Sequence, residues 1–496
     1  MTGTTTETVT PHREADAIAQ TPKQLFIDGQ WVDARGGRTL EVFDPSTAQV
    51  LCSVADADVD DAWDALKAAE RAQAELAALP PRKRSDILMK AFHLMHERID
   101  DLALVMTLEM GKPLAESKGE VAYAAEFFRH FAEEATRIDG GYQTAPAGGS
   151  RFLVARQPVG PSILITPWNF PLAMGTRKLG PAIAAGCASV LKPASQTPLS
   201  MLALAEILAE AGAPAGSVNI VVSSSSGKVM EPLIRSGIAR KLSFTGSTAV
   251  GRKLLEQCAE HVMRTSMELG GNAAFVVFDD ADLDKAVDGA MLAKMRNSGE
   301  ACTAANRIFV HRDVIEEFGR RLTERMSEMK VGRGVDDGVR VGPLIDADQR
   351  EKVLELVDDA VSGGARVLTG GKSLEGDGFF FAPTVLTDVP EQARMRDEEI
   401  FGPVAPLTPF DTEEEAIAAV NSTEYGLVNY LYTESLNRGL RVAEAVESGM
   451  VGLNQGVVSN PAAPFGGVKA SGLGREGGAT GIDEFLEIKL IGIAMD

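Results

Sequence analysis

The chain has 496 residues, of which 45% are hydrophobic and 24% charged, with a formal net charge of −21 and a pI near 4.9. This composition is that of a globular protein with more than one domain, and the negative charge argues against nucleic acid or an anionic membrane as a partner. No segment has the roughly 18 consecutive apolar residues of a membrane helix, and the start lacks the features of a secretory signal or transit peptide. We therefore expect a cytoplasmic protein whose residues 1–23 form a flexible tail.

Along the chain, short apolar runs alternate with helical patterns, as in proteins built on a mostly parallel sheet. A first run lies at QLFIDGQWV, and later ones are SILIT, SVLKP, VNIVV, KLSFTG and AAFVVF. In DADLDKAVDGAMLAKM, Leu283, Val287 and Met291 recur every four positions, which predicts an amphipathic helix. A second series, with RIFV, ARVLT and APLTPF, runs from about 301 to 465. The expected fold class is therefore α/β.

Two predicted strand ends carry polar residues that a ligand could contact. In ITPWNFP, Trp168 and Asn169 follow one strand, and in VLKPASQTP, Lys192 and Ser195 follow the next. Ligands of open α/β sheets bind at the carboxyl ends of strands, and a cation with a hydroxyl suits ribose or phosphate oxygens. Each segment could also be an ordinary loop end.

The glycine spacing of a dinucleotide site occurs in two contexts. GLGREG, residues 472–477, follows a loop near the C-terminus, which is the wrong place for that fingerprint. LSFTGSTAVGRKLLEQCA is the better candidate, because a strand ends at Gly246 and a helix opens at Gly251, so that backbone amides can face a phosphate. A purely structural strand, turn and helix explains this spacing at least as well.

Cysteine usage argues against a structural metal site. Cys52, Cys187, Cys258 and Cys302 are scattered singly, without metal-ligand spacing. Cys302 lies among small residues in NSGEACTAANR, just after the predicted helix. An isolated cysteine is usually inert packing, but a thiolate can also add to an aldehyde carbonyl, so the surrounding motifs decide between the two.

Several motifs together resemble the aldehyde dehydrogenase superfamily. In the family's order and across nearly the whole chain, they are ITPWNFP, LKPAS, FTGSTAVG, MELGGN, the Cys302 segment and EEIFGP. TPWNFPLAMGTRKLGP, SNPAAPFGGVKASGLGREG and FLEIK are most similar to the NADP-preferring succinate-semialdehyde dehydrogenase branch. The resemblance implies that Cys302 adds to an aldehyde, that hydride leaves to a nicotinamide, and that water cleaves the resulting thioester.

The resemblance also implies roles for other residues, and no metal. Glu268, in RTSMELGGN, would activate the hydrolytic water, and Asn169 with the Cys302 backbone N–H would stabilise the oxyanion. Taken alone, Glu268 could be a surface acid and Asn169 a turn residue. The residues implied in cofactor binding are Trp168, Lys192, Ser195, Gly246, Ser247, Leu269, Glu399 and Phe401.

Cofactor choice depends on position 195. NAD-preferring relatives often have a glutamate there, which repels a 2′-phosphate. Ser195 with Lys192 instead offers that phosphate a hydroxyl and a cation. We expect NADP to be preferred, with NAD possible.

Substrate choice depends on Arg177, Arg296 and Ser459, which stand where this branch binds the carboxylate at the far end of its substrate. Two guanidinium groups in an apolar pocket favour an ω-carboxy aldehyde over a neutral one. Succinic semialdehyde, oxidised to succinate, is the expected small-molecule substrate. Glutaric semialdehyde or another ω-carboxy aldehyde is the alternative.

Two positions depart from the family's pattern. Glu300 stands beside the nucleophile where many relatives have glutamine, and a carboxylate facing the sulfur would raise the thiol pKa, so we expect it to point away. Ala304 occupies the place of a second cysteine with which some relatives form a regulatory disulfide, so that switch is absent.

The expected architecture comes from the resemblance and not from periodicity. It implies a cofactor domain with a five-stranded Rossmann-like sheet, over 24–135 and 157–268, and an α/β catalytic domain over 269–477. An oligomerisation β-flap would comprise 136–156 and 478–496, where the apolar FLEIKLIGIA needs a partner strand. A homodimer or homotetramer is expected.

Three other interpretations stay open. A CoA-acylating aldehyde dehydrogenase would pass the thioester to CoA, and the presence of Glu268 argues for water instead. A cysteine hydrolase would need a histidine partner, and none of the six histidines lies in a recognisable dyad segment. A non-enzymatic homologue would be expected to lose Cys302 or Glu268, and both are present.

Overall fold

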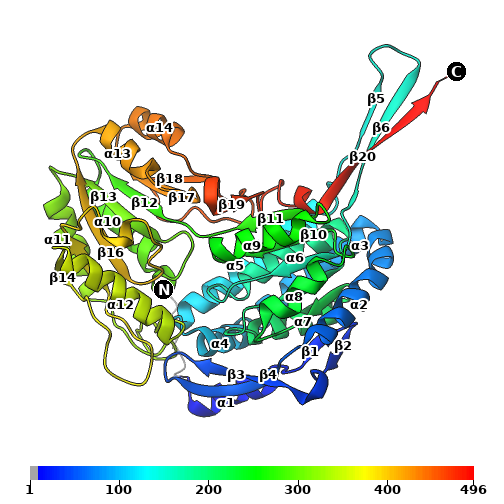
Figure 1. The fold of residues 1–496 in the computed structure, drawn as a ribbon, viewed down its shortest axis with the longest axis horizontal. Helices are drawn as coiled ribbons and strands as arrows, with labels where there is room; N and C mark the ends of the chain where they lie inside the picture. The colour runs from blue at the N-terminus through cyan, green and yellow to red at the C-terminus, as the bar shows by residue number, and fades with distance from the viewer. Residues whose placement is uncertain (1–8, 496) are drawn as a thin grey trace.

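Two sheets covered by helices make up the body of the computed structural model, which describes residues 9–495 (Figure 1). The first sheet has eight strands in the order β19-β11-β10-β7-β8-β9-β1-β2. Their bounds are β1 (Leu25–Ile27), β2 (Gln30–Val32), β7 (Ser162–Ile165), β8 (Ser189–Lys192), β9 (Val218–Ile220), β10 (Lys241–Thr245), β11 (Arg264–Glu268) and β19 (Gly472–Leu473). The strands from β11 to β9 are parallel, β19 and β1 run antiparallel to them, and the edge strand β2 pairs antiparallel with β1. The parallel centre is the expected five-stranded Rossmann-like sheet.

Nine helices of the described chain precede the second sheet. They are α1 (Pro11–Gln20), α2 (Val59–Ala78), α3 (Pro81–Glu97), α4 (Ile99–Met110), α5 (Leu114–Glu134), α6 (Ala173–Ala185), α7 (Leu199–Ala211), α8 (Ser226–Ile234) and α9 (Thr248–Ala259). A two-stranded hairpin, β3 (Thr39–Asp44) and β4 (Gln49–Ala55), lies among them. No helix within residues 9–495 is both long and apolar enough to cross a membrane.

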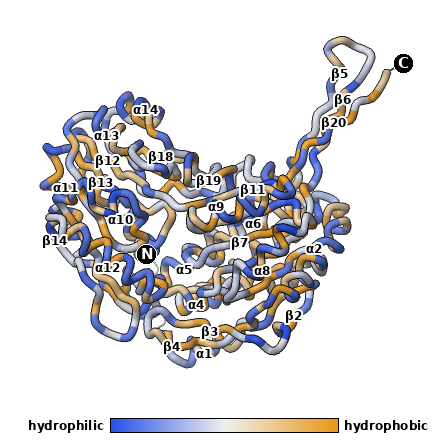
Figure 2. Tube along the Cα trace, in the orientation of Figure 1, coloured by the Kyte–Doolittle hydropathy of each residue, from blue (hydrophilic) through white to orange (hydrophobic). Residues whose placement is uncertain are grey.

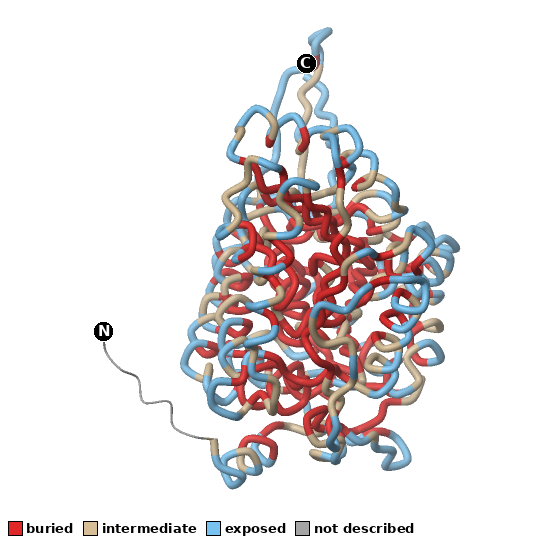
Figure 3. Tube along the Cα trace, turned by 90° about the vertical axis from the view of Figure 1, so that its left-hand side faces the viewer, coloured by how far each residue is buried: buried red, intermediate tan, exposed pale blue. Residues whose placement is uncertain are grey.

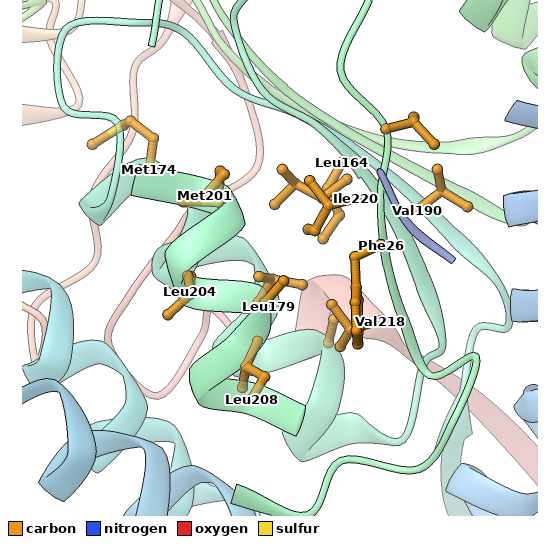
Figure 4. Packing of buried hydrophobic residues seen from close by; sticks show 14 of the residues in the cluster. Phe26, Leu164, Met174, Leu179, Val190, Met201, Leu204, Leu208, Val218 and Ile220 are labelled. Carbon is orange, nitrogen blue, oxygen red and sulfur yellow. The ribbon is translucent and has the colours of Figure 1, made fainter. Parts of the chain in front are cut away.

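Helices α6 and α7 pack their apolar side chains onto the first sheet (Figure 4). Leu179 of α6 and Leu204 of α7 lie in the same buried cluster as Val190 of β8. The two helices approach closely because α6 has a glycine at the contact: a Cβ on Gly175 would lie 2.3 Å from the Met201 side chain. This packing fixes the loop that joins β7 to α6, and with it the ITPWNFP segment.

The second sheet has seven strands in the order β14-β15-β16-β13-β12-β17-β18, all parallel except the edge strand β14. Their bounds are β12 (Ala273–Val277), β13 (Ala305–His311), β14 (Arg366–Thr369), β15 (Thr384–Thr387), β16 (Val404–Phe410), β17 (Val428–Tyr432) and β18 (Met450–Leu453). Its helices are α10 (Leu283–Met295), α11 (Ile315–Ser327), α12 (Ala347–Ser362), α13 (Glu413–Asn421) and α14 (Leu436–Ala445). The predicted strands RIFV, ARVLT and APLTPF and the predicted helix before Cys302 are all confirmed.

A three-stranded antiparallel sheet projects from the body as an arm (Figure 1). It consists of β5 (Gly141–Thr144), β6 (Ser150–Pro158) and β20 (Leu486–Ala494). Nearly all of β20 is exposed (Figure 3), although it alternates through apolar residues such as Ile488 and Leu490 (Figure 2). Residues 478–485 differ from the expected flap, because Ile482 and Phe485 pack into the core of the first sheet.

The N-terminal segment also differs from the expectation. Residues 11–20 form helix α1 where a flexible tail was predicted, and residues 1–8 lie outside the described part of the chain. The helix begins at a normal start signal, since the Thr10 side chain accepts a hydrogen bond from the Arg13 N–H and Pro11 occupies the first turn. Ala17 and Ile18 are buried, and the helix packs on α4. The segment is thus tied to the body by an apolar face.

Candidate active site

A cavity of about 300 Å³ opens beside Cys302, between α5, α6 and the loops from the second sheet. It contains the nucleophile and all three residues predicted to bind a distal carboxylate. Its lining is Lys112, Glu116, Gly119, Glu120, Tyr123, Phe170, Met174, Arg177, Arg296, Cys302, Thr303, Ser459 and Phe465. The structure therefore brings a thiol and two arginines from distant parts of the chain into one enclosed space.

A strained turn delivers Cys302 to this cavity. After α10 ends, Asn297 and Ser298 both take a φ of 54°, and Gly299 follows with a φ of 81°. A Cβ on Gly299 would lie 2.2 Å from the Gly402 carbonyl oxygen, so glycine is required for this approach. Residues other than glycine adopt such a φ at a cost, and strain of this kind is typical of functional sites.

Burial dominates the chemistry of the Cys302 thiol. It raises the thiol pKa to about 12, against the favourable charges of Arg177 and Arg296 and with the added effect of Glu399 and Glu268. The residue is nevertheless partly exposed, whereas Cys187 and Cys258 are buried. Attack on an aldehyde uses the thiolate, so the thiol must first release its proton.

Glu268 ends strand β11 and is a buried carboxyl suited to accept a proton. Among the described residues, its Oε2 has no hydrogen-bond partner. Burial and the neighbouring Glu476 raise its pKa well above the ordinary value, although Lys178, Arg177 and Arg475 act in the opposite direction. Gly466 leaves room for the carboxyl, because a Cβ there would lie 2.8 Å from Oε1.

Glu476 links the base to two cations of α6. Its carboxylate is 2.5 Å from Lys178 Nζ and 3.6 Å from Arg177 Nη1. All three side chains are almost completely buried. The negative charge of Glu476 is thereby shared between adjacent residues of one helix, one of which faces the substrate cavity.

Asn169 is held with its side-chain amide toward the Cys302 loop. Nδ2 donates to the Glu300 carbonyl at 3.1 Å, and Oδ1 accepts from the Phe170 N–H at 3.1 Å. The Asn169 carbonyl accepts from Lys112 Nζ at 2.7 Å and from Asn297 Nδ2 at 2.9 Å. One of the two N–H groups on Nδ2 is left for a ligand, which fits the predicted oxyanion role.

The predicted cofactor residues lie at the carboxyl ends of strands of the first sheet and on the 399–401 loop of the second domain's chain, and we call the region between them the cofactor crevice. Trp168 and Phe401 contact edge to face, with ring centroids 5.3 Å apart. Glu399 accepts a hydrogen bond from the Gly271 N–H at 3.3 Å, and burial raises its pKa to about 7. Phe401 has a φ of 55°, a strained backbone conformation at the residue whose ring contacts Trp168.

The opposite part of the crevice offers donors to an anionic ligand. Burial lowers the pKa of Lys192 to about 8, with no carboxylate acting in the other direction. Ser247 caps α9, whose first turn leaves backbone amides free, and Gly246 precedes it. Leu269 packs against Gly251 at the start of α9, where a Cβ would lie 2.4 Å from its side chain. These groups fit a dinucleotide, because its phosphates are anions and an anion interacts favourably with a buried amine and with a helix N-terminus.

Glu300 points away from the thiol, as predicted. Its Oε1 accepts a hydrogen bond from the Ile345 N–H at 3.0 Å, and it takes no part in lining the cavity. Burial, with a smaller effect from Asp346, raises its pKa well above the ordinary value. The residue is therefore a packed carboxyl and does not act on Cys302.

Sequence reasoning missed several residues of the site. Tyr123 and Phe465 line the cavity, and Lys178 with Glu476 flanks the base. Lys178 is adjacent to Arg177 in the TRK segment, so that segment held the signal. Glu476 lies within GLGREG, a stretch weighed only for its glycines. Tyr123 lies on a long helix with no motif to mark it.

The fold and the cysteine-centred site define an oxidoreductase of the aldehyde dehydrogenase class. The model of the aldehyde dehydrogenase family matches residues 31–491, and the chain belongs to this family. It is 56% identical to a succinate-semialdehyde dehydrogenase of Paenarthrobacter nicotinovorans, over 90% of this chain and 99% of that protein. A glutarate-semialdehyde dehydrogenase of Pseudomonas putida is 51% identical, over 95% of this chain and 98% of that protein. The crystal structure of an E. coli NADP-dependent enzyme superposes with a TM-score of 0.95 at 51% identity, covering 96% and 98% of the two chains.

Proposed function

We propose that this protein oxidises succinic semialdehyde to succinate and reduces NADP, with NAD as a second acceptor. The observation that carries the proposal is the single cavity in which Cys302 lies together with Arg177, Arg296 and Ser459. An aldehyde that reaches the thiol can place a distal carboxylate beside two guanidinium groups. The similarity to semialdehyde dehydrogenases supports this substrate class.

The first half of the reaction forms a covalent intermediate on Cys302. The Cys302 thiol releases its proton to solvent water, the thiolate sulfur bonds to the aldehyde carbon as the carbonyl π bond opens, and Asn169 Nδ2 with the Cys302 N–H donates to the oxyanion that forms. The cofactor, when bound, accepts the hydride that leaves this carbon. Arg177 and Arg296 hold the far end of the substrate and so orient the carbonyl at the sulfur.

The second half regenerates the thiol. Glu268 takes a proton from water as the water oxygen bonds to the thioester carbon, and the carbon–sulfur bond then breaks to release the acid. The Oε2 atom of Glu268 has no hydrogen-bond partner among the described residues, so it is free to accept the proton. The nearby charges of Glu476 and Lys178 act on the pKa of this carboxyl in opposite directions. Glu268 thus serves as the general base of hydrolysis.

We further propose which residues hold each part of NADP. Lys192 and Ser195 would hold the adenosine ribose and its 2′-phosphate, and Gly246, Ser247 and the start of α9 would hold the pyrophosphate. Trp168, Leu269, Glu399 and Phe401 would enclose the nicotinamide riboside. The buried Lys192 amine, which has no acid acting on it, supports this assignment.

An aldehyde panel tests the proposal. We expect kcat/KM with NADP to be highest for succinic semialdehyde, lower for glutaric semialdehyde and much lower for butanal, and NADP to be preferred over NAD about 10-fold or more. A preference for glutaric semialdehyde would move the function to the second candidate, which the Pseudomonas putida relative favours. Equal use of butanal would overturn the carboxylate assignment.

We also propose that the arm of β5, β6 and β20 joins a neighbouring copy, giving a homodimer or homotetramer. Its exposed apolar side chains, among them Tyr142, Ile488 and Leu490, support this assembly. The division into cofactor domain, catalytic domain and flap is part of this proposal, with the C-terminal part of the flap beginning at Leu486 and not at residue 478. Sedimentation of an Ile488→Asp, Leu490→Asp double variant is expected to show smaller particles than the parent.

A further inference from the structure

Three polar side chains at the wall of the cavity are bonded to one another. Arg177 Nη2 donates to Tyr123 Oη at 2.5 Å and lies 3.4 Å from Ser459 Oγ. The two hydroxyl oxygens are 2.5 Å apart. We call Tyr123, Arg177 and Ser459 the donor cluster, and all of its members line the cavity that contains Cys302.

Counting protons shows that the donor cluster has a surplus. A guanidinium group only donates, so both hydroxyl oxygens can accept from Arg177, and each hydroxyl has one proton. If Tyr123 donates to Ser459, the serine proton is free, and if Ser459 donates to Tyr123, the phenol proton is free. Within residues 9–495, neither hydroxyl has a further hydrogen-bond partner, and Arg177 Nε has none either. A ligand at this wall therefore meets donors in either arrangement.

The acids in the cavity do not cancel this surplus. Glu120 pairs with the buried Lys112, and it also accepts from the backbone N–H groups of Leu172 and Ala173. Glu116 accepts from the Asn297 N–H at 2.6 Å. Glu120 is thus occupied, while Glu116 has one hydrogen bond and interacts with the charge of Arg296, which also contacts Thr303 Oγ1 at 3.3 Å and lies 5.3 Å from the Phe170 ring centroid. Neither carboxylate is hydrogen-bonded to the donor cluster in the described part of the chain.

The donor cluster is also rigid before any ligand arrives. The Tyr123 ring contacts Phe127 edge to face, with centroids 5.0 Å apart. The Arg177 guanidinium lies over the Phe465 ring at 4.1 Å and over Phe127 at 5.0 Å. Because α5 and α6 pack directly on each other, their side chains hold a fixed geometry. A ligand that fits does not have to organise these residues first.

We propose that Tyr123 is a specificity-determining residue, which with Ser459 and Arg177 presents a cationic surface with a free hydroxyl proton to the distal anionic group of the substrate. This inference rests on the proposed function and adds a residue to it. Tyr123 accepts the Arg177 N–H, so that one hydroxyl proton of the Tyr123–Ser459 pair always points to the ligand. A carboxylate or sulfonate, which only accepts, matches this surface, and an alkyl end leaves the donors unpaired.

Removing the Tyr123 hydroxyl tests the inference. For Tyr123→Phe, we expect kcat/KM for succinic semialdehyde to fall about 10- to 100-fold, mainly through KM, because a hydrogen bond to a charged group is lost. For butanal, kcat/KM should stay within about twofold of the parent. Tyr142→Phe, on the exposed strand β5, removes the same hydroxyl away from the cavity and should change neither value.

A double-variant cycle distinguishes shared from independent action. Ser459→Ala removes the other hydroxyl, and because the two share one bond, the effect of both changes together should differ from the product of the single effects by at least about threefold. Single effects that simply multiply would overturn the shared donor surface.

The remaining outcomes distinguish a failure of the role of Tyr123 from a failure of the proposed substrate. Equal losses for both aldehydes in Tyr123→Phe, or no loss for either, would overturn the role of Tyr123 while the parent's preference for succinic semialdehyde still stood. If the parent enzyme itself does not prefer the carboxylated aldehyde, the proposed substrate fails, and the inference fails with it.

Discussion

The cofactor crevice and the substrate cavity differ in whether their polar side chains already have hydrogen-bonding or charged partners within the protein. Among the described residues, Lys192 of the crevice is buried without an acid partner, and the Ser195 hydroxyl bonds only its neighbour Gln196, at 3.3 Å. In the cavity, Arg177, Tyr123 and Ser459 bond one another before any ligand is present. A dinucleotide brings its own charges to unpaired groups, whereas a small aldehyde must match an arrangement that already exists.

This difference predicts which substitutions change the preferred cofactor and which reduce activity. An unpaired group in the crevice can be replaced with a change of preferred cofactor, because few other contacts depend on it. A group in the cavity has partners, so its loss also disturbs them.

The largest effect is expected at the boundary between the two regions. Cys302→Ala removes the nucleophilic sulfur, on which the proposed roles of both regions depend. Dehydrogenase turnover should therefore fall by at least about four orders of magnitude. Binding of NADP, followed by fluorescence titration, should remain. Turnover that survived in this variant would mean that another group carries the covalent chemistry, and neither region would then be correctly assigned.

Within the cavity, Arg296→Ala is the cleaner test of carboxylate recognition. Arg177 also contacts Glu476, so its removal disturbs the base, whereas Arg296 contacts Thr303 at 3.3 Å and the Phe170 ring and forms no ion pair within the described residues. We expect kcat/KM for succinic semialdehyde to fall about 30- to 1000-fold, from a lost contact of ~2–4 kcal/mol. Butanal should be oxidised within a few-fold of the parent rate or faster. Equal losses of kcat/KM for the two aldehydes would show that Arg296 holds the Cys302 loop in place and does not bind the substrate carboxylate.

Within the crevice, Ser195→Glu should change the cofactor and leave the substrate alone. The new carboxylate repels a 2′-phosphate, so kcat/KM for NADP should fall about 10-fold or more, while NAD is used as well as before or better. Measuring KM for succinic semialdehyde at saturating cofactor provides the control. A change in that KM would contradict the separation of the two regions.

A smaller effect is expected at Glu300, which belongs to neither region. Its pKa in the fold is raised above the ordinary 4.5. Between these values the folded protein holds a proton that the unfolded chain releases, so the stability that this group contributes is present at low pH and is lost as the pH rises. Glu300→Gln keeps an oxygen for the Ile345 N–H and removes this dependence, which amounts to at most about 1.4 kcal/mol per pH unit.

Thermal unfolding at two pH values measures this effect. The melting temperature of Glu300→Gln relative to the parent should be higher at pH about 8 than at pH about 5.5. A difference that does not vary with pH would mean that Glu300 is charged in the fold. The same variant should oxidise succinic semialdehyde like the parent, since the carboxyl does not face Cys302.

The crevice was more predictable from the sequence than the cavity. Trp168, Lys192 and Gly246 follow strands directly, and in a parallel sheet such ends must meet at one edge. The cavity is built by packing between elements: Tyr123 comes from α5, Arg177 from α6 and Ser459 from a late loop. No local pattern records that these three meet, so the hydroxyl of Tyr123 could not be found without the fold.

The fold was predicted in its sheets and less well at its ends. The alternation of apolar runs and helical patterns identified β7, β8, β9 and β10 of the first sheet and β12, β13, β14 and β16 of the second, whereas β15, β17 and β18 were not predicted. At the N-terminus, polar residues suggested a tail, but Thr10 and Pro11 start a helix whose Ala17 and Ile18 are buried. At the C-terminus, Phe485 belongs to the core and the exposed strand begins after it, a division that depends on tertiary packing.

The central claim is that thiol and carboxyl divide the reaction between them, and Glu268→Gln tests it most directly. Rapid mixing of this variant with NADP and succinic semialdehyde should give a burst of about one NADPH per active site and then a stall, with an acyl group trapped on Cys302 that intact-mass measurement detects. Cys302→Ala should give neither signal. A Glu268→Gln enzyme with no burst and no acyl-enzyme would contradict the account, because Glu268 would then be needed before hydride leaves.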